Sequence, residues 1–138
     1  MTRAAFEQAI EQGRFLEWVE YGGNLYGTLH SDVEGRLAAG DDVILEIELQ
    51  GARVMRRSLS DATFVFLAPP SAAELADRLR GRGTESEKAV ATRLRIAEQE
   101  LAAAREFDHV VVNDVVKRAA TEVAAIISAH RSAQTEGE

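Results

Sequence analysis

Cysteine is absent from the 138-residue sequence. Its absence excludes a disulfide framework, thiolate chemistry and the zinc-ribbon or redox motifs that depend on cysteine. Long apolar runs are also absent, since none approaches the ~18 residues that a membrane-spanning helix needs. The first residues do not have the pattern of a signal peptide. We therefore expect a cytoplasmic protein that does not act at a membrane.

Lysine is almost absent as well. Arginine supplies 14 of the 16 basic residues, and the two lysines are Lys88 and Lys117. Acidic residues number 23, so the formal net charge is −7. This balance argues against a nucleic-acid-binding role, because phosphate backbones require a basic surface. Arginine, however, grips phosphate and carboxylate groups through its planar fork, and three arginines fall within residues 78–82.

The length and composition fit one globular domain over residues 1–138. Hydrophobic residues make up 46% of the sequence and charged residues 28%, which is not the composition of a disordered chain. Single domains are commonly about 100–150 residues long. Residues 132–138 are polar, and we expect this tail to fray.

Short apolar runs alternate with helical patterns along the chain. The runs at 43–48 (VILEIE), 63–67 (TFVFL) and 109–112 (HVVV) indicate buried strands. Such strands, alternating with helices, are typical of parallel βαβ units, so the predicted fold class is α/β. Helices are predicted over residues 2–12, 31–40, 50–59, 71–81, 84–107 and from beyond Asp114 to about Arg131. Three of them have a capping box at their start: Ser31 with Glu34, Ser71 with Glu74, and Thr84 with Glu87.

A β-hairpin is predicted near the N-terminus. Extended runs at 15–21 and 25–29 are joined by Gly22-Gly23-Asn24, residue types that accept the positive φ angles of a tight turn. The hairpin gathers acceptors, hydroxyls and aromatic rings. Glu17 could accept paired N–H donors such as those on the edge of guanine, while tyrosine and threonine hydroxyls could fix a phosphate or carbonyl oxygen. Phe15 and Trp18 are more simply core or strand-face residues.

Two carboxylates end the first apolar run. Glu46 and Glu48 are spaced i, i+2, which puts both on one face of a strand, at the carboxyl end where ligands gather in α/β folds. Neighbouring carboxylates repel unless a cation, such as a hydrated divalent metal or an arginine, lies between them. The alternative is that the strand has ended there and that both side chains are solvated.

The arginines form the third candidate cluster. Arg78 and Arg82 share a helix face at i, i+4, and Arg93 lies on the following helix. Several arginines that converge on one site suit a polyphosphate and the charge of phosphoryl transfer. The alternative is a solvated helix face that pairs with neighbouring acidic residues such as Glu74 and Asp77, and the charge pattern alone favours it.

Taken together, these segments resemble guanylate kinase, a family of enzymes that transfer a phosphoryl group from ATP to GMP. The matching segments keep the family's order and run across nearly the whole chain. They are FLEW…YGGNLYGT (15–28), VILEIELQGA (43–52), FLAPPS (66–71), LADRLRGRGTES (75–86), ATRL (91–94) and VVND (111–114). The resemblance implies a P-loop NTPase-like three-layer α/β fold with parallel core strands, a GMP-binding region over 15–40 and a helical lid with its flanking helices over 71–95.

On the acceptor side, the resemblance implies that Glu17 and Thr28 contact the guanine base and that Tyr26 holds the GMP phosphate. Glu46 and Glu48 stand where the family has acidic residues near the acceptor nucleotide and the metal. Aspartate is commoner at both positions. Glu48 would act on Mg²⁺ indirectly.

On the donor side, the resemblance implies that Arg82 and Arg93, with Arg78 as a third, neutralise the phosphoryl group in transfer. Arg82 and Asn113 would lie near ATP. The expected partners are therefore GMP and ATP with Mg²⁺, with dGMP as a second acceptor, and the oligomeric state stays open.

One family element has no counterpart in the sequence. The family begins with a strand and a phosphate loop that ends in Gly-Lys-Ser/Thr, whereas this sequence contains no Gly-Lys dipeptide. Residues from Thr2 onward already resemble family sequence that lies inside the domain. We therefore expect an N-terminally truncated guanylate kinase that binds GMP weakly and is catalytically impaired. The family's first strand is central in its sheet, so its loss would leave apolar edges on 43–47 and a neighbouring strand.

Two further interpretations stay open. The first is a non-catalytic binding module, as in scaffold proteins that keep this fold without its chemistry. Such modules tend to lose nucleotide-site residues, whereas Glu17, Tyr26, Thr28, Arg82 and Arg93 are all present. The second is an unrelated soluble α/β domain.

The expected truncation makes a prediction about the coding DNA. The family often has Val where Met1 stands, and a GTG valine codon can be read as a start. We expect an open reading frame that encodes a phosphate loop directly upstream. Sequencing that region tests this expectation, and an in-frame stop codon with no such reading frame before it would contradict it.

Overall fold

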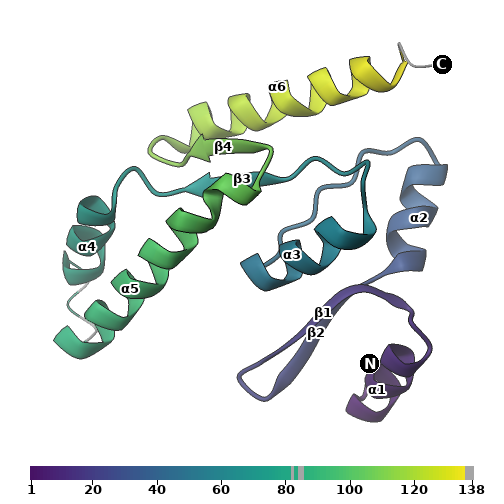
Figure 1. Cartoon of the computed structure of the whole chain (residues 1–138), viewed down its shortest axis with the longest axis horizontal. Coiled ribbons are helices and arrows are strands. Elements are labelled where there is room, and N and C mark those ends of the chain that lie inside the picture. Colours follow the sequence, from purple (N-terminus) through teal and green to yellow (C-terminus); the bar gives the residue numbers. More distant parts are fainter. Residues whose placement is uncertain (82, 84–85, 136–138) are drawn as a thin grey trace. The chain divides into compact units, whose positions relative to one another are not determined.

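The computed structural model describes residues 1–81, 83 and 86–135. It forms two compact units, one over residues 1–62 and one over residues 63–138 (Figure 1). The division falls between the predicted helix at 50–59 and the predicted strand at 63–67. Each unit is described on its own below, and the single domain predicted for residues 1–138 stays a prediction.

The first unit consists of a hairpin and three helices. In chain order its elements are α1 (Arg3–Glu11), β1 (Phe15–Tyr21), β2 (Asn24–Leu29), α2 (His30–Ala38) and α3 (Leu49–Ser58). Helix α3 packs on β1, and α2 packs on β2. The buried side of α3 carries Gly51, Ala52 and Met55, whereas Arg56 and Arg57 point to solvent. This split between an apolar stripe and a charged face is what holds an amphipathic helix on a strand.

Helix α1 is fixed to the hairpin by ring stacking and by one arginine. The Thr2 hydroxyl caps the helix by accepting the Ala5 N–H at 3.3 Å. The ring of Phe6 stacks on that of Phe15 with centroids 4.2 Å apart. Arg3 donates to the Glu20 carboxylate and to the Gly23 carbonyl, both at 3.2 Å. The hydrogen bonds to Glu20 and to Glu7 raise the pKa of Arg3, with Glu20 the larger cause.

The predicted hairpin is confirmed, with a tighter turn than expected. Strands β1 and β2 pair antiparallel, with Tyr21 opposite Asn24, so only Gly22 and Gly23 form the turn. Both have positive φ, 58° and 81°, which a two-residue turn matched to strand twist requires. A third glycine, Gly27, allows the two strands to approach closely at this point. A Cβ there would lie only 2.8 Å from the Glu17 carbonyl oxygen.

The strand predicted at 43–48 is wrong, because residues 41–48 have no regular secondary structure. Their exposure still alternates: Val43, Leu45 and Ile47 are half-buried, whereas Ile44 is 71% exposed. A strand is stabilised by a hydrogen-bonded neighbour. Within residues 1–62, all of which the structure describes, β1 and β2 pair with each other and no ladder to this segment forms. The apolar run has the alternation of a strand but lacks a partner.

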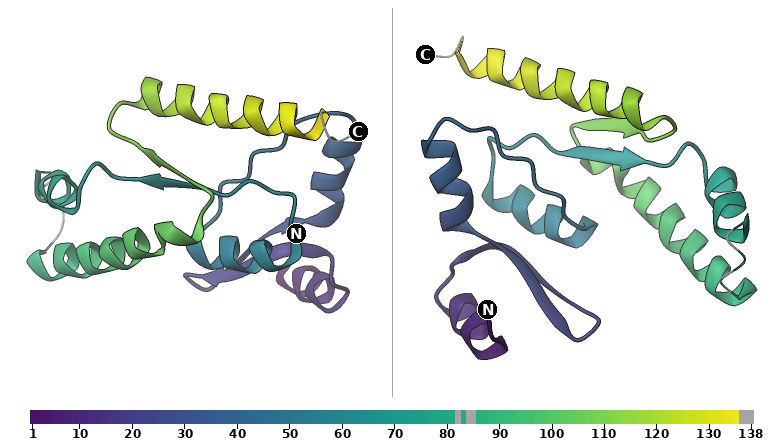
Figure 2. Two further views of the ribbon diagram at one scale, coloured as in Figure 1. Left: turned by 45° about the horizontal axis from the view of Figure 1, so that its top comes forward. Right: turned by 180° about the vertical axis from the view of Figure 1, so that it is seen from behind.

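The second unit has the predicted parallel strands. Its elements are β3 (Val65–Ala68), α4 (Ala72–Gly81), α5 (Glu87–Ala103), the 3₁₀ turn η1 (Ala104–Glu106), β4 (His109–Val112) and α6 (Val116–Thr135). Strands β3 and β4 pair in parallel, with Val65 opposite His109 and Ala68 opposite Val112. Helix α6 packs on β4, and α4 packs on α5. Figure 2 shows α6 beside this strand pair in two further views.

Asp108 joins the beginnings of the two parallel strands. Its carboxylate accepts the Phe64 N–H at 2.8 Å, and its own N–H donates to the Phe64 carbonyl at 2.9 Å. At the other end, the Asn113 N–H donates to the Ala68 carbonyl at 2.8 Å. Val111 between them is 1% exposed and forms the centre of the core. Hydrogen bonds at both ends therefore fix the register of two strands that are only four residues long.

The capping boxes have three different outcomes. The predicted cap at Ser71 is confirmed, since the Ser71 hydroxyl accepts the Glu74 N–H at 3.0 Å. The Ser31 cap is wrong: α2 begins at His30, directly after β2, and its N-cap Leu29 makes no side-chain bond. Here the His30 N–H bonds to the Arg14 carbonyl at 3.0 Å, so strand pairing sets the start of the helix. Thr84 lies outside the described residues, and the cap of α5 is Ser86.

The described residues contain no helix that is long and apolar enough to cross a lipid bilayer.

The start of α6 carries an exposed ion pair with a measurable consequence. Arg118 pairs with Asp114 across one turn, and the Val115 N–H donates to the same carboxylate at 2.6 Å. Both bonds lower the pKa of Asp114, with Arg118 the larger cause. A carboxyl with a lowered pKa stabilises the folded state above its ordinary pKa, and this stabilisation is lost as the pH falls through the lowered value.

We expect Arg118→Ala to raise the pKa of Asp114 toward, but not fully to, its ordinary value, because the Val115 bond remains. Carboxyl ¹³C NMR during an acid titration measures this pKa. Lys117→Ala is the control, since it removes a neighbouring positive charge that makes no ion pair with Asp114. An Asp114 pKa that moves equally in both variants would contradict the assigned cause.

Candidate functional site

The candidate site is built around a buried acid, Glu17. Glu17 is 6% exposed. Among the residues whose side chains the structure describes, it is the one buried charged residue. Burial of a carboxyl group costs free energy unless hydrogen bonds or a favourable field replace its hydration. Glu17 lies just after an irregularity in β1, where the register shifts between Phe15 and Glu17.

Two neighbours replace the lost hydration of Glu17. Across the hairpin, the Thr28 hydroxyl donates to Glu17 Oε1 at 2.8 Å. On the other side, Oε2 lies against the first turn of α3, at 3.0 Å from the point that a Cβ on Gly51 would occupy. The start of a helix carries a partial positive charge from its unpaired N–H groups, and a negative group beside it is stabilised. The carboxyl group is therefore held between a hydroxyl donor and the positive end of a helix.

The pairing of the hairpin also places Tyr26. Glu17 lies opposite Thr28, and Val19 lies opposite Tyr26. Alternate residues on a strand share a face, so Tyr26 is on the same hairpin face as Glu17 and Thr28. Tyr26 is 53% exposed, which leaves its ring and hydroxyl accessible. The structure thus brings together the three hairpin residues predicted to contact GMP.

Glu46 and Glu48 lead into α3 from the other side. Both are exposed on a segment that is not a strand, which is the solvated arrangement that was the alternative interpretation of this pair. Glu48 is the N-cap residue of α3, but its side chain makes no capping hydrogen bond. The positive end of α3 offsets part of the repulsion between two adjacent carboxylates. Glu46 and Glu48 therefore lie in the chain just before α3, and Glu17 lies beside its first turn.

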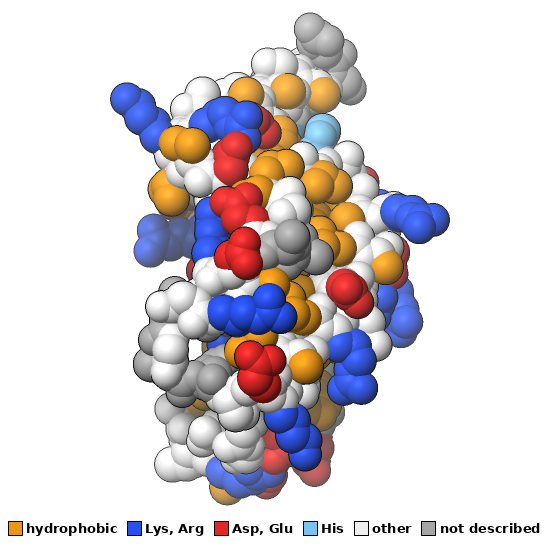
Figure 3. Space-filling model, turned by 90° about the vertical axis from the view of Figure 1, so that its left-hand side faces the viewer, with side chains coloured by type: hydrophobic (Ala, Val, Ile, Leu, Met, Phe, Trp, Pro, Cys, Tyr) orange, Lys and Arg blue, Asp and Glu red, His pale blue; other side chains and the backbone are white. Residues whose placement is uncertain are grey.

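The donor-side residues lie in the second unit. Arg78 on α4 pairs with Glu74 at 3.1 Å, the surface pairing that was the alternative interpretation of its charge pattern. Arg93 is on α5 with an exposed side chain, and Asn113 follows β4. Arg82 lies outside the described residues. Acidic and basic side chains are interspersed on the side of this unit formed by α4 and α5 (Figure 3).

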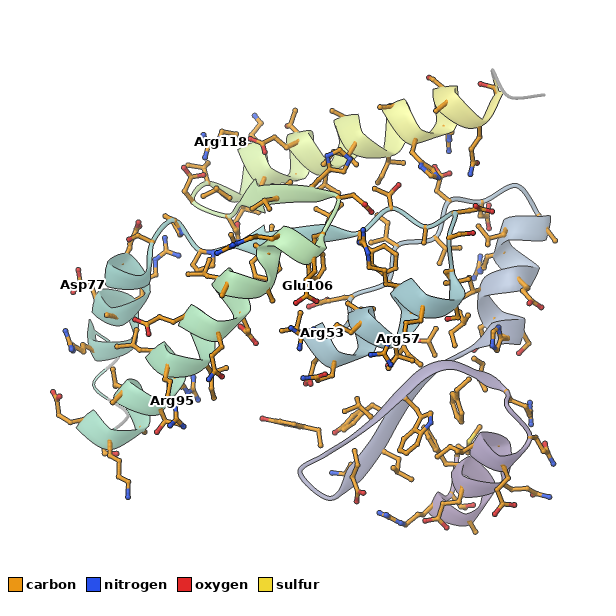
Figure 4. The ribbon with its side chains drawn as sticks, in the orientation of Figure 1. Arg53, Arg57, Asp77, Arg95, Glu106 and Arg118 are labelled. Carbon is orange, nitrogen blue, oxygen red and sulfur yellow. The ribbon has the colours of Figure 1, made fainter. Side chains whose placement is uncertain are left out.

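The described residues contain no group of three or more His, Asp and Glu side chains that could hold a metal ion. Arg53 and Arg57 extend from α3, as Figure 4 shows.

Sequence reasoning missed Gly51. It is buried in the first turn of α3, and its lack of a side chain makes room for the Glu17 carboxyl group. A glycine inside a helix costs about 1 kcal/mol relative to alanine, so its presence in an otherwise helical pattern was the available indication of a close contact. The identity of that contact depends on β1, which lies far from Gly51 in sequence.

The comparisons with known proteins identify the family and the fold. The parallel strand pair with its helices makes the chain an α/β protein, and a sequence model described as Guanylate kinase matches residues 1–130. The chain belongs to the guanylate kinase family. The family and fold class inferred from its motifs are therefore confirmed.

Individual relatives give the extent of the similarity. The chain is 51% identical to the guanylate kinase of Streptococcus mutans over 126 residues, which cover 91% of this chain and 60% of that protein. It is 54% identical to the guanylate kinase of Rubrobacter xylanophilus over 127 residues, covering 92% and 66%. A crystal structure of guanylate kinase from Anaplasma phagocytophilum matches with a TM-score of 0.72 at 27% identity, covering 94% of this chain and 62% of that one. The chain thus spans less than two thirds of the length of these relatives.

The bond between Thr28 and Glu17 gives a stability prediction. Thr28→Val keeps the shape of the side chain but removes the hydroxyl, which leaves Glu17 Oε1 buried without this donor. We expect the free energy of unfolding to fall by about 1–3 kcal/mol, the usual cost of an unsatisfied buried group. Denaturant titration followed by circular dichroism, which reports on the helices of both units, measures the change.

The matched control is Thr121→Val on α6. The Thr121 hydroxyl donates to the Lys117 carbonyl at 2.9 Å on an exposed helix face. Exposed substitutions of this kind change stability by only about 0.5 kcal/mol or less. If both substitutions lowered the free energy of unfolding by the same amount, the bond from Thr28 would not stabilise the buried Glu17 carboxyl group.

Proposed function

We propose that the protein transfers a phosphoryl group from ATP to GMP or dGMP, and that the hairpin and α3 form the acceptor-nucleotide side of its site. The observation that carries the proposal is the buried Glu17 carboxyl group, held by Thr28 across the hairpin at 2.8 Å. Membership of the guanylate kinase family supports the same assignment. The hairpin belongs to residues 15–40, the predicted GMP-binding region.

Glu17 would read the guanine base. A carboxylate only accepts hydrogen bonds, and guanine presents neighbouring N–H donors that include its 2-amino group. Glu17 therefore suits guanine and does not suit adenine, whose corresponding edge lacks these donors. Thr28 would orient the carboxylate and contact the base, and the exposed Tyr26 hydroxyl would donate to the phosphate of GMP.

The remaining roles belong to phosphoryl transfer. Arg93 and Arg82, with Arg78 as a third, would stabilise the charge on the transferred group, and Arg82 and Asn113 would lie near ATP. Mg²⁺, when bound, neutralises the phosphates of ATP. The exposed Glu46 and Glu48 at the start of α3 suit contacts near the acceptor and, for Glu48, a water-mediated contact to the ion.

For the 138 residues themselves, we propose GMP binding without appreciable turnover. The β- and γ-phosphates of ATP are cradled in this class of enzyme by a glycine-rich loop and its lysine. The 138 residues contain no Gly-Lys dipeptide. Phosphoryl transfer depends on positioning and on charge stabilisation, so Arg78, Arg82 and Arg93 alone do not replace that cradle.

A thermal-unfolding experiment tests the acceptor side. GMP should stabilise the 138-residue chain, by about 2.7 kcal/mol when its concentration is about 100 times Kd, and AMP should not. Glu17→Gln should reduce the shift sharply, because the amide places N–H donors where guanine also donates. Glu20→Gln is the matched control on the same strand, since its exposed pair with Arg3 contributes little.

An ADP-release assay with ATP, Mg²⁺ and GMP tests turnover. We expect no GMP-dependent release from the 138-residue chain, and robust release would overturn the proposed impairment. Absence of GMP stabilisation at saturation would overturn the acceptor site. That result would favour the alternative of a non-catalytic, guanylate-kinase-like binding module.

A further inference from the structure

We propose that Gly51 is a positioning residue for guanine recognition. Its missing side chain leaves the space that fixes the Glu17 carboxyl group. This inference rests on the proposed role of Glu17 as the residue that reads the base. Gly51 itself would not contact the nucleotide.

The carboxyl group of Glu17 has little room to move. Oε1 is tied to the Thr28 hydroxyl at 2.8 Å, and the residue is 6% exposed. Oε2 lies 3.0 Å from the position of a Cβ on Gly51, and Glu17 Cδ and Cγ lie 3.5 and 3.7 Å from it. A methyl group at position 51 would therefore press on Oε2, whereas Cδ and Cγ would stay at ordinary contact distance. To relieve this contact the carboxylate must shift by a few tenths of an ångström, which would strain its bond to Thr28.

The absence of a side chain at position 51 is not required by the backbone. Gly51 lies in a regular helix without a positive φ, so alanine would fit the conformation and would favour the helix. Gly35 in α2 provides the contrast, because a Cβ there would meet no atom within 4 Å. Of these two helical glycines, only Gly51 occupies a position where a side chain would meet a neighbour. That neighbour is the carboxyl group of Glu17, the proposed base-reading group.

The position of the carboxyl group matters most for the 2-amino group of guanine. To accept both N–H donors of guanine, the two oxygens of Glu17 must face them together. Hypoxanthine, the base of IMP, keeps the ring N–H but lacks the amino group. A displaced carboxylate would lose the second bond first, so GMP would lose more affinity than IMP. A general loss of structure would weaken both nucleotides alike.

The test compares Gly51→Ala and Gly35→Ala in the 138-residue chain, with Kd for GMP and for IMP measured by isothermal calorimetry. We expect Gly51→Ala to raise Kd for GMP by about tenfold or more, the effect of misaligning one hydrogen bond to a charged group. Its Kd for IMP should change less. Gly35→Ala makes the same chemical change in another helix and should leave both constants as they are.

A double-mutant cycle with Glu17→Gln separates positioning from a structural effect. In the Glu17→Gln background the base-reading carboxylate is already absent, so Gly51→Ala should cause no further loss of preference for GMP over IMP. An equal loss for both nucleotides, an additive cycle, or an unchanged Kd for GMP in Gly51→Ala would overturn the role of Gly51. If the unsubstituted chain does not prefer GMP to IMP, the proposed role of Glu17 fails and this inference fails with it.

Circular dichroism establishes that each variant is folded. If Gly51→Ala alone does not fold, the double variant Glu17→Asp/Gly51→Ala decides the question, because aspartate is shorter by one methylene and withdraws from the added methyl group. Recovery of folding in that variant supports the contact between Gly51 and Glu17. No recovery would mean that the space at Gly51 serves some other neighbour, and the proposal would be wrong.

Discussion

A carboxyl group stays out of water only where hydrogen bonds or an oriented dipole replace its hydration, and the first unit is arranged around this requirement at Glu17. The hairpin supplies the Thr28 hydroxyl from the opposite strand, and α3 supplies the positive end of a helix. Each contact restricts the packing of one element. The bond from Thr28 requires β2 to pair with β1 in one register, and the contact with α3 requires a glycine at position 51 because the helix approaches β1 so closely. The proposed recognition of guanine and the packing of this unit therefore depend on the same side chain.

Backbone pairing decides which apolar runs become strands. Strands β3 and β4 are only four residues long, yet they form because each supplies the other's partner and Asp108 joins their ends. The run at 43–48 is longer, has four apolar residues, and its side chains alternate in exposure, but no described strand pairs with it. Hydrophobic pattern is thus necessary for a strand but is not sufficient, because the ladder of hydrogen bonds comes from elsewhere in the chain.

Local chemistry made much of the structure predictable from sequence. The glycines of the turn, the periodicity of the helices and the cap at Ser71 act over a few residues, and all appear where expected. Predictions failed where a distant element decides. Strand pairing at Arg14 starts α2 at His30 and displaces the Ser31 cap, and the missing ladder removes the strand at 43–48. For the site, motifs identified Glu17, Tyr26 and Thr28, whereas Gly51 was missed because its contact with β1 exists only in three dimensions.

The tight turn at Gly22 and Gly23 has a consequence for the order of folding. Glu17 and Thr28 are only 11 residues apart, so their contact requires the closure of one short loop, which costs little chain entropy and takes microseconds in isolated hairpins. The contact between Glu17 and Gly51 needs a much longer segment of chain to close. Loop length alone therefore favours a hairpin that closes first, with α3 docking afterwards onto a carboxyl group whose direction the hairpin sets.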